Sequence, residues 1–273
     1  MICNQCPRKC NTDRESTLGF CKSPQRFRVS RAALHFWEEP CISGENGSGT
    51  VFFSGCNLRC VFCQNYEISR ENKGVEISDE KLVSIFEKLI SQGAHNINLV
   101  NPSHYACRLA SVLSKWKSPV PIVYNTSGYD SVETLKMLDG LVDIYLPDFK
   151  YTRSDKALRY SKAADYPETA KAALAEMYRQ QPKCEFDEKG LMKKGVVIRH
   201  LILPSNTNSS LEAVDYLTDN FPNAFISLMA QYVPCGDLSA FKEIDRKITK
   251  REFRRFHLSA QASLSAARQS IAA

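Results

Sequence analysis

The most chemically distinctive feature of the sequence is a group of three cysteines, Cys56, Cys60 and Cys63, spaced as Cys-x3-Cys-x2-Cys. Three thiolates this close together can hold one face of a cubane iron–sulfur cluster. A cubane that only carries electrons takes four cysteines, so a three-cysteine site leaves one iron without a protein ligand. That iron could bind a substrate, as the open position of a catalytic zinc does. The alternative is a zinc ion that takes a fourth ligand such as His35 or Cys41.

A second group of cysteines lies at the start of the chain: Cys3, Cys6, Cys10 and Cys21. Four thiolates close a metal site, which suits either structural zinc or an auxiliary cubane cluster, and the sequence leaves both open. Either would fold a segment too polar to form its own core. In a reducing compartment such clustering indicates metal or cluster ligation rather than disulfides. The scattered cysteines are expected to be ordinary thiols: Cys41, Cys107, Cys184 and Cys235.

The composition is that of an ordinary globular protein, with 273 residues, 43% hydrophobic and 24% charged. No stretch approaches the roughly 18 apolar residues of a membrane span, and the first residues show no secretory signal. We therefore expect a cytoplasmic protein with no membrane partner. The net charge of +6 is mild, and much of it lies in residues 246–255. A solvated helix face explains it at least as well as nucleic-acid binding, which we do not expect.

From Thr50 onward, short apolar strands alternate with helices, a pattern typical of α/β proteins with parallel βαβ units. Periodicity alone allows a doubly wound sheet or an open barrel. We expect a partial parallel (βα)6 barrel with the cysteine loop at its C-terminal mouth, because sites on parallel barrels gather there. Strands are predicted at residues 51–53, 96–100, 121–124, 142–146, 195–203 and 224–229, and helices at 78–92, 103–115, 131–138 and 209–220.

The expected segments are a cysteine-rich segment at residues 1–48, the barrel at 49–248 and a helical tail at 249–273. The barrel contains a long connection at residues 151–194, in which we predict a helix over 165–181 and a small hairpin over 184–192. Long insertions are often lids or binding loops. A surface decoration is the alternative, and the sequence leaves both open.

The cysteine motif has an aromatic residue, Phe62, before its last cysteine and lies in the loop after the first predicted strand. In both respects it resembles the signature of the radical S-adenosylmethionine (SAM) superfamily. The resemblance implies a [4Fe–4S] cluster at Cys56, Cys60 and Cys63, with Phe62 at the cofactor. The open iron would chelate SAM, and a reduced cluster would cleave it to methionine and a 5′-deoxyadenosyl radical that abstracts a hydrogen atom. The protein positions the cofactor and excludes water.

Further motifs resemble one branch of this superfamily, the activating enzymes of glycyl-radical enzymes, and most closely the poorly characterised relatives of the pyruvate formate-lyase activator. This resemblance implies abstraction of a hydrogen atom from a backbone glycine of a large partner enzyme. A flavodoxin or ferredoxin-type protein would donate the electron. The motifs lie at residues 37–44, 96–100, 124–129, 145–150, 199–204 and 229–232.

Within these motifs the resemblance implies cofactor contacts at five positions. Asn125 and Ser127 stand where activators carry Asp-Thr-Asn-Gly at a strand end, and should face the cofactor. Asp148 and Lys150 match the activators' Asp-x-Lys; Lys150 can neutralise the methionyl carboxylate, and Asp148 can form a hydrogen bond with SAM. Arg199 is a further candidate, with a satisfied core residue as its alternative.

Two positions depart from the activators. Where activators carry Gly-Gly-Glu after the second strand, this chain reads Val100-Asn101-Pro102. The contact with the SAM amino group would then come from Asn101 or from backbone carbonyls. Activators also often place a histidine after the tyrosine at the sixth strand end, where Val233 follows Tyr232 here.

The sequence therefore supports three functions and does not name a substrate. The first is activation of a glycyl-radical enzyme. The second is radical modification of another peptide, a nucleotide or a small molecule. The third is a non-catalytic, metal-bound module that binds nucleic acid or protein. Release of 5′-deoxyadenosine separates the third function from the other two, and electron spin resonance of a candidate partner separates the first from the second.

Overall fold

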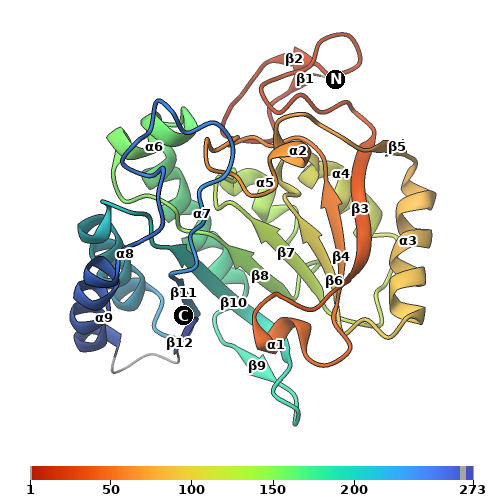
Figure 1. The fold of residues 1–273 in the computed structure, drawn as a ribbon. Coiled ribbons are helices and arrows are strands. Elements are labelled where there is room, and N and C mark those ends of the chain that lie inside the picture. Colours follow the sequence, from red (N-terminus) through yellow and green to blue (C-terminus); the bar gives the residue numbers. More distant parts are fainter. Residues whose placement is uncertain (1, 265–268, 273) are drawn as a thin grey trace.

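The computed structural model describes residues 2–264 and 269–272 (Figure 1). Its strands are β1 Ile2–Cys3, β2 Thr12–Asp13, β3 Phe27–His35, β4 Ser48–Phe53, β5 Val75–Ile77, β6 Ile97–Val100, β7 Ile122–Thr126, β8 Ile144–Pro147, β9 Glu185–Phe186, β10 Met192–Leu201, β11 Phe225–Met229 and β12 Gln269–Ala272. Apart from the small pair β1–β2, they form one sheet in the order β12-β11-β10-β8-β7-β6-β4-β3-β5, and β9 pairs with β10.

The six predicted strands correspond to β4, β6, β7, β8, β10 and β11. Each runs parallel to the next, and they lie side by side in chain order. A doubly wound sheet would reverse its strand order part-way across, whereas this order does not. The predicted partial parallel barrel is therefore confirmed.

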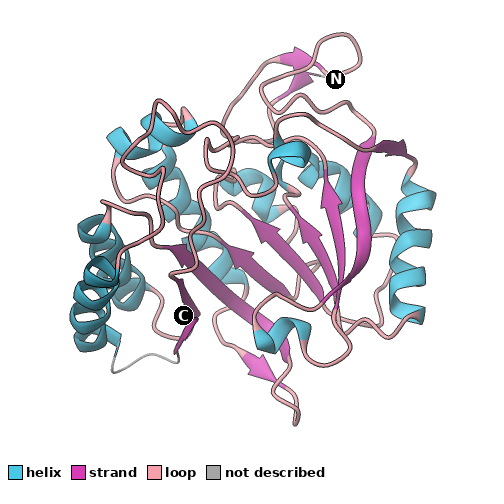
Figure 2. Cartoon of the chain, viewed as in Figure 1, coloured by secondary structure: helices cyan, strands magenta, loops and turns pink. Residues whose placement is uncertain are grey.

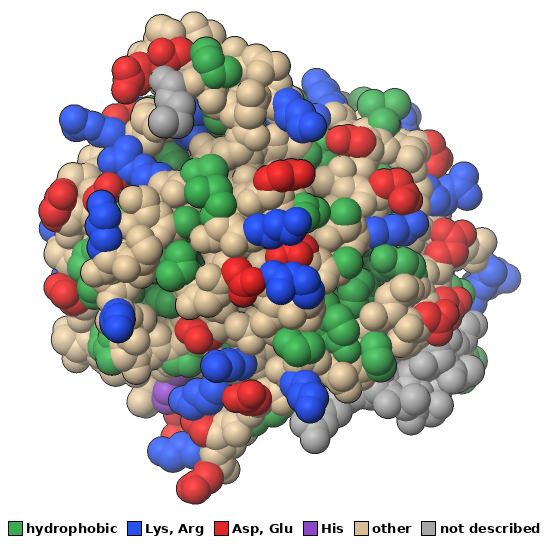
Figure 3. Space-filling model, turned by 180° about the vertical axis from the view of Figure 1, so that it is seen from behind, with side chains coloured by type: hydrophobic (Ala, Val, Ile, Leu, Met, Phe, Trp, Pro, Cys, Tyr) green, Lys and Arg blue, Asp and Glu red, His purple; other side chains and the backbone are tan. Residues whose placement is uncertain are grey.

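Helices cover the outer face of this sheet (Figure 2). All the predicted helices are present, and α3 shows why: Ser78 caps its N-terminus by accepting a hydrogen bond from the Lys81 backbone N–H at 3.2 Å. On this outer face, basic and acidic side chains are interspersed (Figure 3). The helices are α1 Pro40–Ser43, α2 Tyr66–Ser69, α3 Asp79–Ser91, α4 Ala106–Leu113, α5 Val132–Lys136, α6 Ser154–Ser161, α7 Tyr166–Gln180, α8 Thr207–Asn220 and α9 Lys250–Leu264.

The short helix α1 closes the inner side of the barrel near the N-terminal ends of the strands. Ile42 of α1 is fully buried and packs with five inward-facing apolar residues: Val123, Ile144, Leu146, Met192 and Val197. This small core is separate from the larger one between the sheet and the outer helices. A segment that precedes the first barrel strand thus forms the floor of the barrel.

The cysteine-rich segment contains more regular structure than the sequence indicates. Residues Phe27–His35 form β3, which pairs antiparallel with both β4 and β5. The strand was not predicted because its residues, FRVSRAALH, show only partial alternation of apolar and polar side chains. It covers the edge of the barrel that begins with β4.

The connection at residues 151–194 contains α6, α7 and β9. The predicted hairpin is present, since β9 pairs antiparallel with the start of β10. It lies at the N-terminal ends of the strands, opposite the cysteine loop and α2 (Figure 1). The hairpin therefore does not form a lid, because it lies at the end of the barrel opposite the mouth.

The predicted helical tail is helical only in part. Helix α9 spans Lys250–Leu264, and the tail then forms β12, which pairs parallel with β11. Residues 265–268 and 273 of the predicted tail lie outside the described residues. Among the described helices, none is long and apolar enough to cross a membrane.

Candidate functional site

The loop that carries Cys56, Cys60 and Cys63 begins directly after β4, at the C-terminal ends of the barrel strands. Cys56 and Cys60 are buried, and the Cys56 sulfur accepts hydrogen bonds from the backbone N–H groups of Leu58 at 3.3 Å and Arg59 at 3.4 Å. Burial raises the pKa of the Cys56 thiol to about 12. A thiolate at this position therefore needs a compensating positive charge, which a bound metal supplies.

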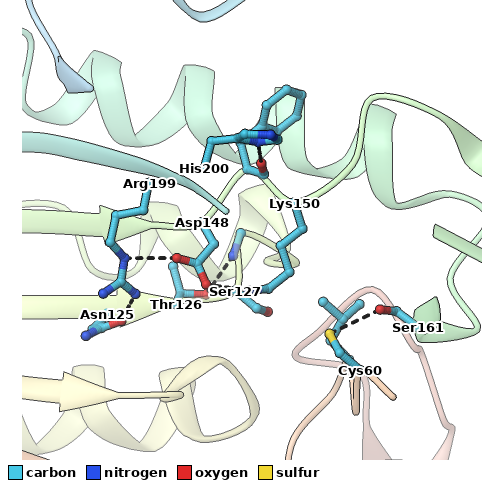
Figure 4. A network of polar contacts seen from close by, with 12 residues as sticks. Cys60, Asn125, Thr126, Ser127, Asp148, Lys150, Ser161, Arg199 and His200 are labelled. Atoms are coloured by element: carbon cyan, nitrogen blue, oxygen red, sulfur yellow. Dashed lines mark hydrogen bonds and ion pairs between the residues drawn. The ribbon is translucent and has the colours of Figure 1, made fainter. Parts of the chain in front are cut away.

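The opposite side of the mouth is formed by the ends of β7, β8 and β10 (Figure 4). Asp148 lies between two cations: its carboxylate is 2.5 Å from the Lys150 ammonium and 2.9 Å from Arg199 Nε. The guanidinium of Arg199 also donates to the side-chain oxygen of Asn125 at 2.7 Å. Burial alone would raise the pKa of Asp148, but Arg199 and Lys150 hold it below its usual value. The structure thus brings together Asn125, Asp148, Lys150 and Arg199.

Glu38 completes this network and was not among the predicted site residues. Its carboxylate accepts from Arg199 Nη1 at 3.0 Å and from the Asn125 side-chain amide at 3.2 Å. Burial, together with the nearby Glu39 and Asp148 carboxylates, raises the pKa of Glu38, while Arg199 opposes the shift. The only signal in the sequence was its place in the motif at residues 37–44.

Ser127 lies at the end of β7 with its hydroxyl buried, and no hydrogen-bond partner for that hydroxyl exists within the described part of the chain. Its carbonyl oxygen accepts from the Tyr166 hydroxyl at 2.8 Å, and Tyr166 also donates to the Asp148 carbonyl at 2.9 Å. Gly128 has φ +77°, and a Cβ there would lie 2.3 Å from the Asp148 carbonyl oxygen. Glycine therefore lets the β7 and β8 ends approach closely. The buried Ser127 hydroxyl is available to a ligand.

Two other residues that were predicted to contact the cofactor, Asn101 and Phe62, instead pack on the cysteine loop or its surroundings. Asn101 has φ +58°, donates its backbone N–H to Asn125, and donates its side-chain amide to the carbonyl of Gly55. Phe62 is buried between Tyr160 and Tyr232, with ring centroids at 6.3 and 5.9 Å.

His200 is a satisfied core residue. It is 2% exposed, its Nδ1 donates to the Phe149 carbonyl at 2.6 Å, and its Nε2 lies 2.9 Å from the Ser210 hydroxyl. Burial lowers its pKa to about 4, so it stays neutral near pH 7.

Three kinds of comparison relate this chain to known proteins. A model of the radical SAM superfamily matches residues 50–217, which is more than half of the chain. The chain belongs to the radical SAM superfamily. Over 260 residues it is 30% identical to "Uncharacterized protein MJ0674" of Methanocaldococcus jannaschii, a match that covers 92% of this chain and 71% of that protein.

The fold of this radical SAM protein is similar to the solved structure of methylornithine synthase (PylB), with a TM-score of 0.54. The match covers 79% of this chain and 60% of that one, so the chain spans less than two thirds of the enzyme's length. At 14% sequence identity this likeness shows the fold alone.

Membership of the superfamily implies SAM and a [4Fe–4S] cluster, and the residues present fit both. Three cysteines share one loop, which leaves an open iron. Facing them lies a cation, Lys150: burial raises the pKa of Cys60, and the charge of Lys150 offsets part of that shift. The Ser127 hydroxyl, which has no partner among the described residues, lies on the same side. An anionic and a polar group of a ligand would each find a partner there.

The N-terminal cysteines of this radical SAM protein lie near one another. Burial, and then the neighbouring thiols of Cys21, Cys3 and Cys10, raise the pKa of Cys6 to about 12. The Cys10 sulfur accepts from the Phe20 backbone N–H at 3.4 Å. Across the described residues, no three cysteine, histidine or carboxylate side chains are grouped closely enough for a single metal ion, and this applies to both cysteine groups.

Proposed function

We propose that this radical SAM enzyme cleaves SAM at a [4Fe–4S] cluster held by Cys56, Cys60 and Cys63. The observation that carries the proposal is the position of Lys150. It lies at the end of β8, 19% exposed, with Asp148 on one side and Cys60 close enough for its charge to act on the thiol. A cation beside a cluster ligand, at the mouth of the barrel, would pair with a substrate carboxylate that binds the open iron.

The chain's own residues then have separate tasks. Lys150 neutralises the methionyl carboxylate. Asp148 holds the Lys150 ammonium with one carboxylate oxygen and Arg199 with the other, and its remaining lone pairs would accept a hydrogen bond from the cofactor. Ser127 supplies a hydroxyl without a competing partner among the residues described. When bound and reduced, the cluster supplies one electron to the sulfonium of SAM, which yields methionine and a 5′-deoxyadenosyl radical. The low exposure of Cys56 and Cys60, 8% and 7%, keeps water away from these two cluster ligands.

The partner we propose is a glycyl-radical enzyme, from whose backbone glycine the radical takes a hydrogen atom. The support is the set of motifs shared with activating enzymes, including residues 124–129 and 145–150, which meet at the site. A flavodoxin or ferredoxin-type protein would supply the electron. We also propose that the four N-terminal thiols hold structural zinc or a second cluster; the support is their number and their spacing in the sequence, at positions 3, 6, 10 and 21.

A second candidate, radical modification of a small polar molecule, is favoured by Asn98. This residue lies on β6 between Ile97 and Leu99, which belong to the outer core, so its side chain is on the inner side. It is fully buried, and neither its amide nitrogen nor its oxygen has a partner among the described residues. Buried amides are normally paired, so a polar ligand inside the barrel would explain it.

The experiment begins with the anaerobically reconstituted chain, dithionite and SAM, and measures 5′-deoxyadenosine. Wild type should release it, and Cys60→Ala should not, while metal at the N-terminal cysteines remains. Equal release from the Cys56→Ala/Cys60→Ala/Cys63→Ala variant would overturn the proposal. Loss of N-terminal metal is checked separately by iron and zinc analysis of Cys6→Ala/Cys21→Ala. A glycyl radical detected by electron spin resonance in a candidate partner enzyme supports activation. If no glycyl radical forms and a small molecule is converted instead, the second candidate is supported.

A further inference from the structure

The last residue of α6, Ser161, touches a cluster ligand directly. Its hydroxyl donates a hydrogen bond to the Cys60 sulfur at 3.1 Å (Figure 4), and its side chain is buried, at 1% exposure. The hydroxyl of Tyr151, 3% exposed, lies 2.7 Å from the Ser161 oxygen. Because the Ser161 hydrogen points to sulfur, the Tyr151 hydroxyl is the donor of the second bond. The Tyr151 hydroxyl also lies within hydrogen-bonding reach of Cys60, so both hydroxyls can donate toward this cluster ligand, Ser161 directly and Tyr151 either directly or through Ser161.

The position of the Ser161 hydroxyl is fixed from both sides. The Tyr160 carbonyl accepts a hydrogen bond from the Val61 backbone N–H in the cysteine loop at 2.9 Å. Arg8 then joins the same two elements, since its guanidinium donates to the Asn57 carbonyl at 2.7 Å and to the Ser161 carbonyl at 2.9 Å. The end of α6 is thus held against the cysteine loop. These backbone contacts place the Ser161 hydroxyl next to the Cys60 sulfur.

A donor aimed at a cluster thiolate affects the two oxidation states differently. When the cluster gains an electron, more negative charge resides on its sulfur ligands, and a hydrogen bond to one of them becomes stronger. Hydrogen bonds to the sulfurs are one of the factors that set the reduction potential of such clusters. In a buried, low-dielectric site the difference is larger than in water, and a second donor behind the first polarises it further.

We propose that Ser161, supported by Tyr151, raises the reduction potential of the cluster at Cys56, Cys60 and Cys63, so that an external low-potential donor can reduce it. Ser161 is thus a positioning residue that acts through Cys60. The inference rests on the proposed function, because it requires the cluster to be bound there. It assigns a task to the connection at residues 151–194, whose first helix supports the cluster while its hairpin lies elsewhere.

The test is a redox titration of the reconstituted full chain, followed by electron spin resonance of the reduced cluster. The signal to follow is the one that changes when SAM is added, since only the cluster with an open iron can bind it. Ser161→Ala should lower the equilibrium constant for reduction at least tenfold, which for one electron is about 59 mV to more negative potential. Tyr151→Phe should shift it in the same direction by less. Ser114→Ala is the control, because that exposed hydroxyl lies at the end of α4 and donates to the Ser111 carbonyl at 3.0 Å.

The outcomes separate this inference from the proposed function. A wild type with no reducible cluster at Cys56, Cys60 and Cys63 overturns both. Ser161→Ala with the wild-type iron content and an unchanged potential overturns the inference alone. If Ser161→Ala loses its cluster, Tyr151→Phe decides, since removing one hydroxyl oxygen leaves the ring packing in place; an unchanged potential in that variant is also contrary to the inference.

Discussion

The carbonyl oxygen of Cys21 lies 2.5 Å from the place where any residue other than glycine at position 55 would carry its Cβ. Gly55 directly precedes Cys56, and its backbone has φ +82°, which favours glycine. The Ser23 hydroxyl approaches the same point and donates to the Ser54 carbonyl at 3.0 Å. The N-terminal cysteine segment is therefore packed directly on the loop of the other three cysteines.

Replacing Gly55 by alanine should separate these two segments. We expect Gly55→Ala to lower the free energy of unfolding by more than the roughly 1–3 kcal/mol of a strained backbone, because a backbone oxygen must also move. Gly140→Ala is a matched control: its φ is +75°, but a Cβ there has nothing within 4 Å. Urea unfolding of both variants checks the difference, and equal losses would show that the Cys21 contact does not matter.

Lys150→Met should weaken SAM binding while the rest of the site remains. The substitution removes one charge-assisted contact, a loss of about 1.5–3 kcal/mol, or about 10- to 150-fold in affinity. Asp148 keeps its ion pair with Arg199 at 2.9 Å, so we expect the mouth to stay intact. Calorimetric titration of the reconstituted protein measures the affinity, with Lys136→Met on α5 as the exposed control. Equal affinity in wild type and Lys150→Met would remove Lys150 from the site.

Shortening the hairpin at residues 184–192 should have little effect on the chemistry. Its tip lies at the end of the barrel opposite the cysteine loop (Figure 1). We therefore expect a variant whose turn at residues 187–190 is replaced by Asn-Gly to bind SAM and release 5′-deoxyadenosine within about twofold of wild type. A folded variant that no longer cleaves SAM would contradict this and would require a path from the hairpin to the mouth.

His200 should make the protein less stable in mild acid. Burial lowers the pKa of His200 to about 4, below the ordinary value of about 6.5 that it regains on unfolding. Between these values the unfolded chain binds a proton and the folded one does not, so stability is lost as the pH falls below about 6.5. At pH 5.5 the protonation of His200 in the unfolded chain lowers the free energy of unfolding by about 1.4 kcal/mol relative to pH 7.5. Urea midpoints at pH 7.5 and 5.5 should differ less in His200→Gln than in wild type; identical differences would contradict the assignment.

The sequence predicts most of the barrel because the information is local. Each of the six strands is a short apolar run, and the helices between them carry apolar residues at helical spacing; α3 has in addition a capping side chain, Ser78. The strand β3 was missed because its pairing with β4 and β5, and not its own pattern, decides its conformation. The hairpin was predicted as a structure, but the sequence left its role open between a lid and a surface decoration; its place directly before β10 puts it at the strands' N-terminal ends and excludes a lid.

The candidate site could be predicted only where a motif carries it. Asp148 and Lys150 stand in one motif, and the structure brings them together with Asn125 and Arg199. Ser161 contacts Cys60 from 101 residues further along the chain, and no local pattern of sequence indicates such a contact. Such contacts depend on how α6 packs, which one sequence alone does not reveal.

The floor of the barrel has a consequence for the order of folding. Glu38 is synthesised early, whereas its partner Arg199 lies 161 residues further along the chain. Ile42 likewise packs on Val197, which belongs to the fifth of the six parallel strands. During synthesis from the N-terminus, the segment that fills the barrel must wait for nearly three quarters of the polypeptide to emerge. Contacts of this length form slowly, so the enclosed polar centre is completed late, after the local βα units that surround it.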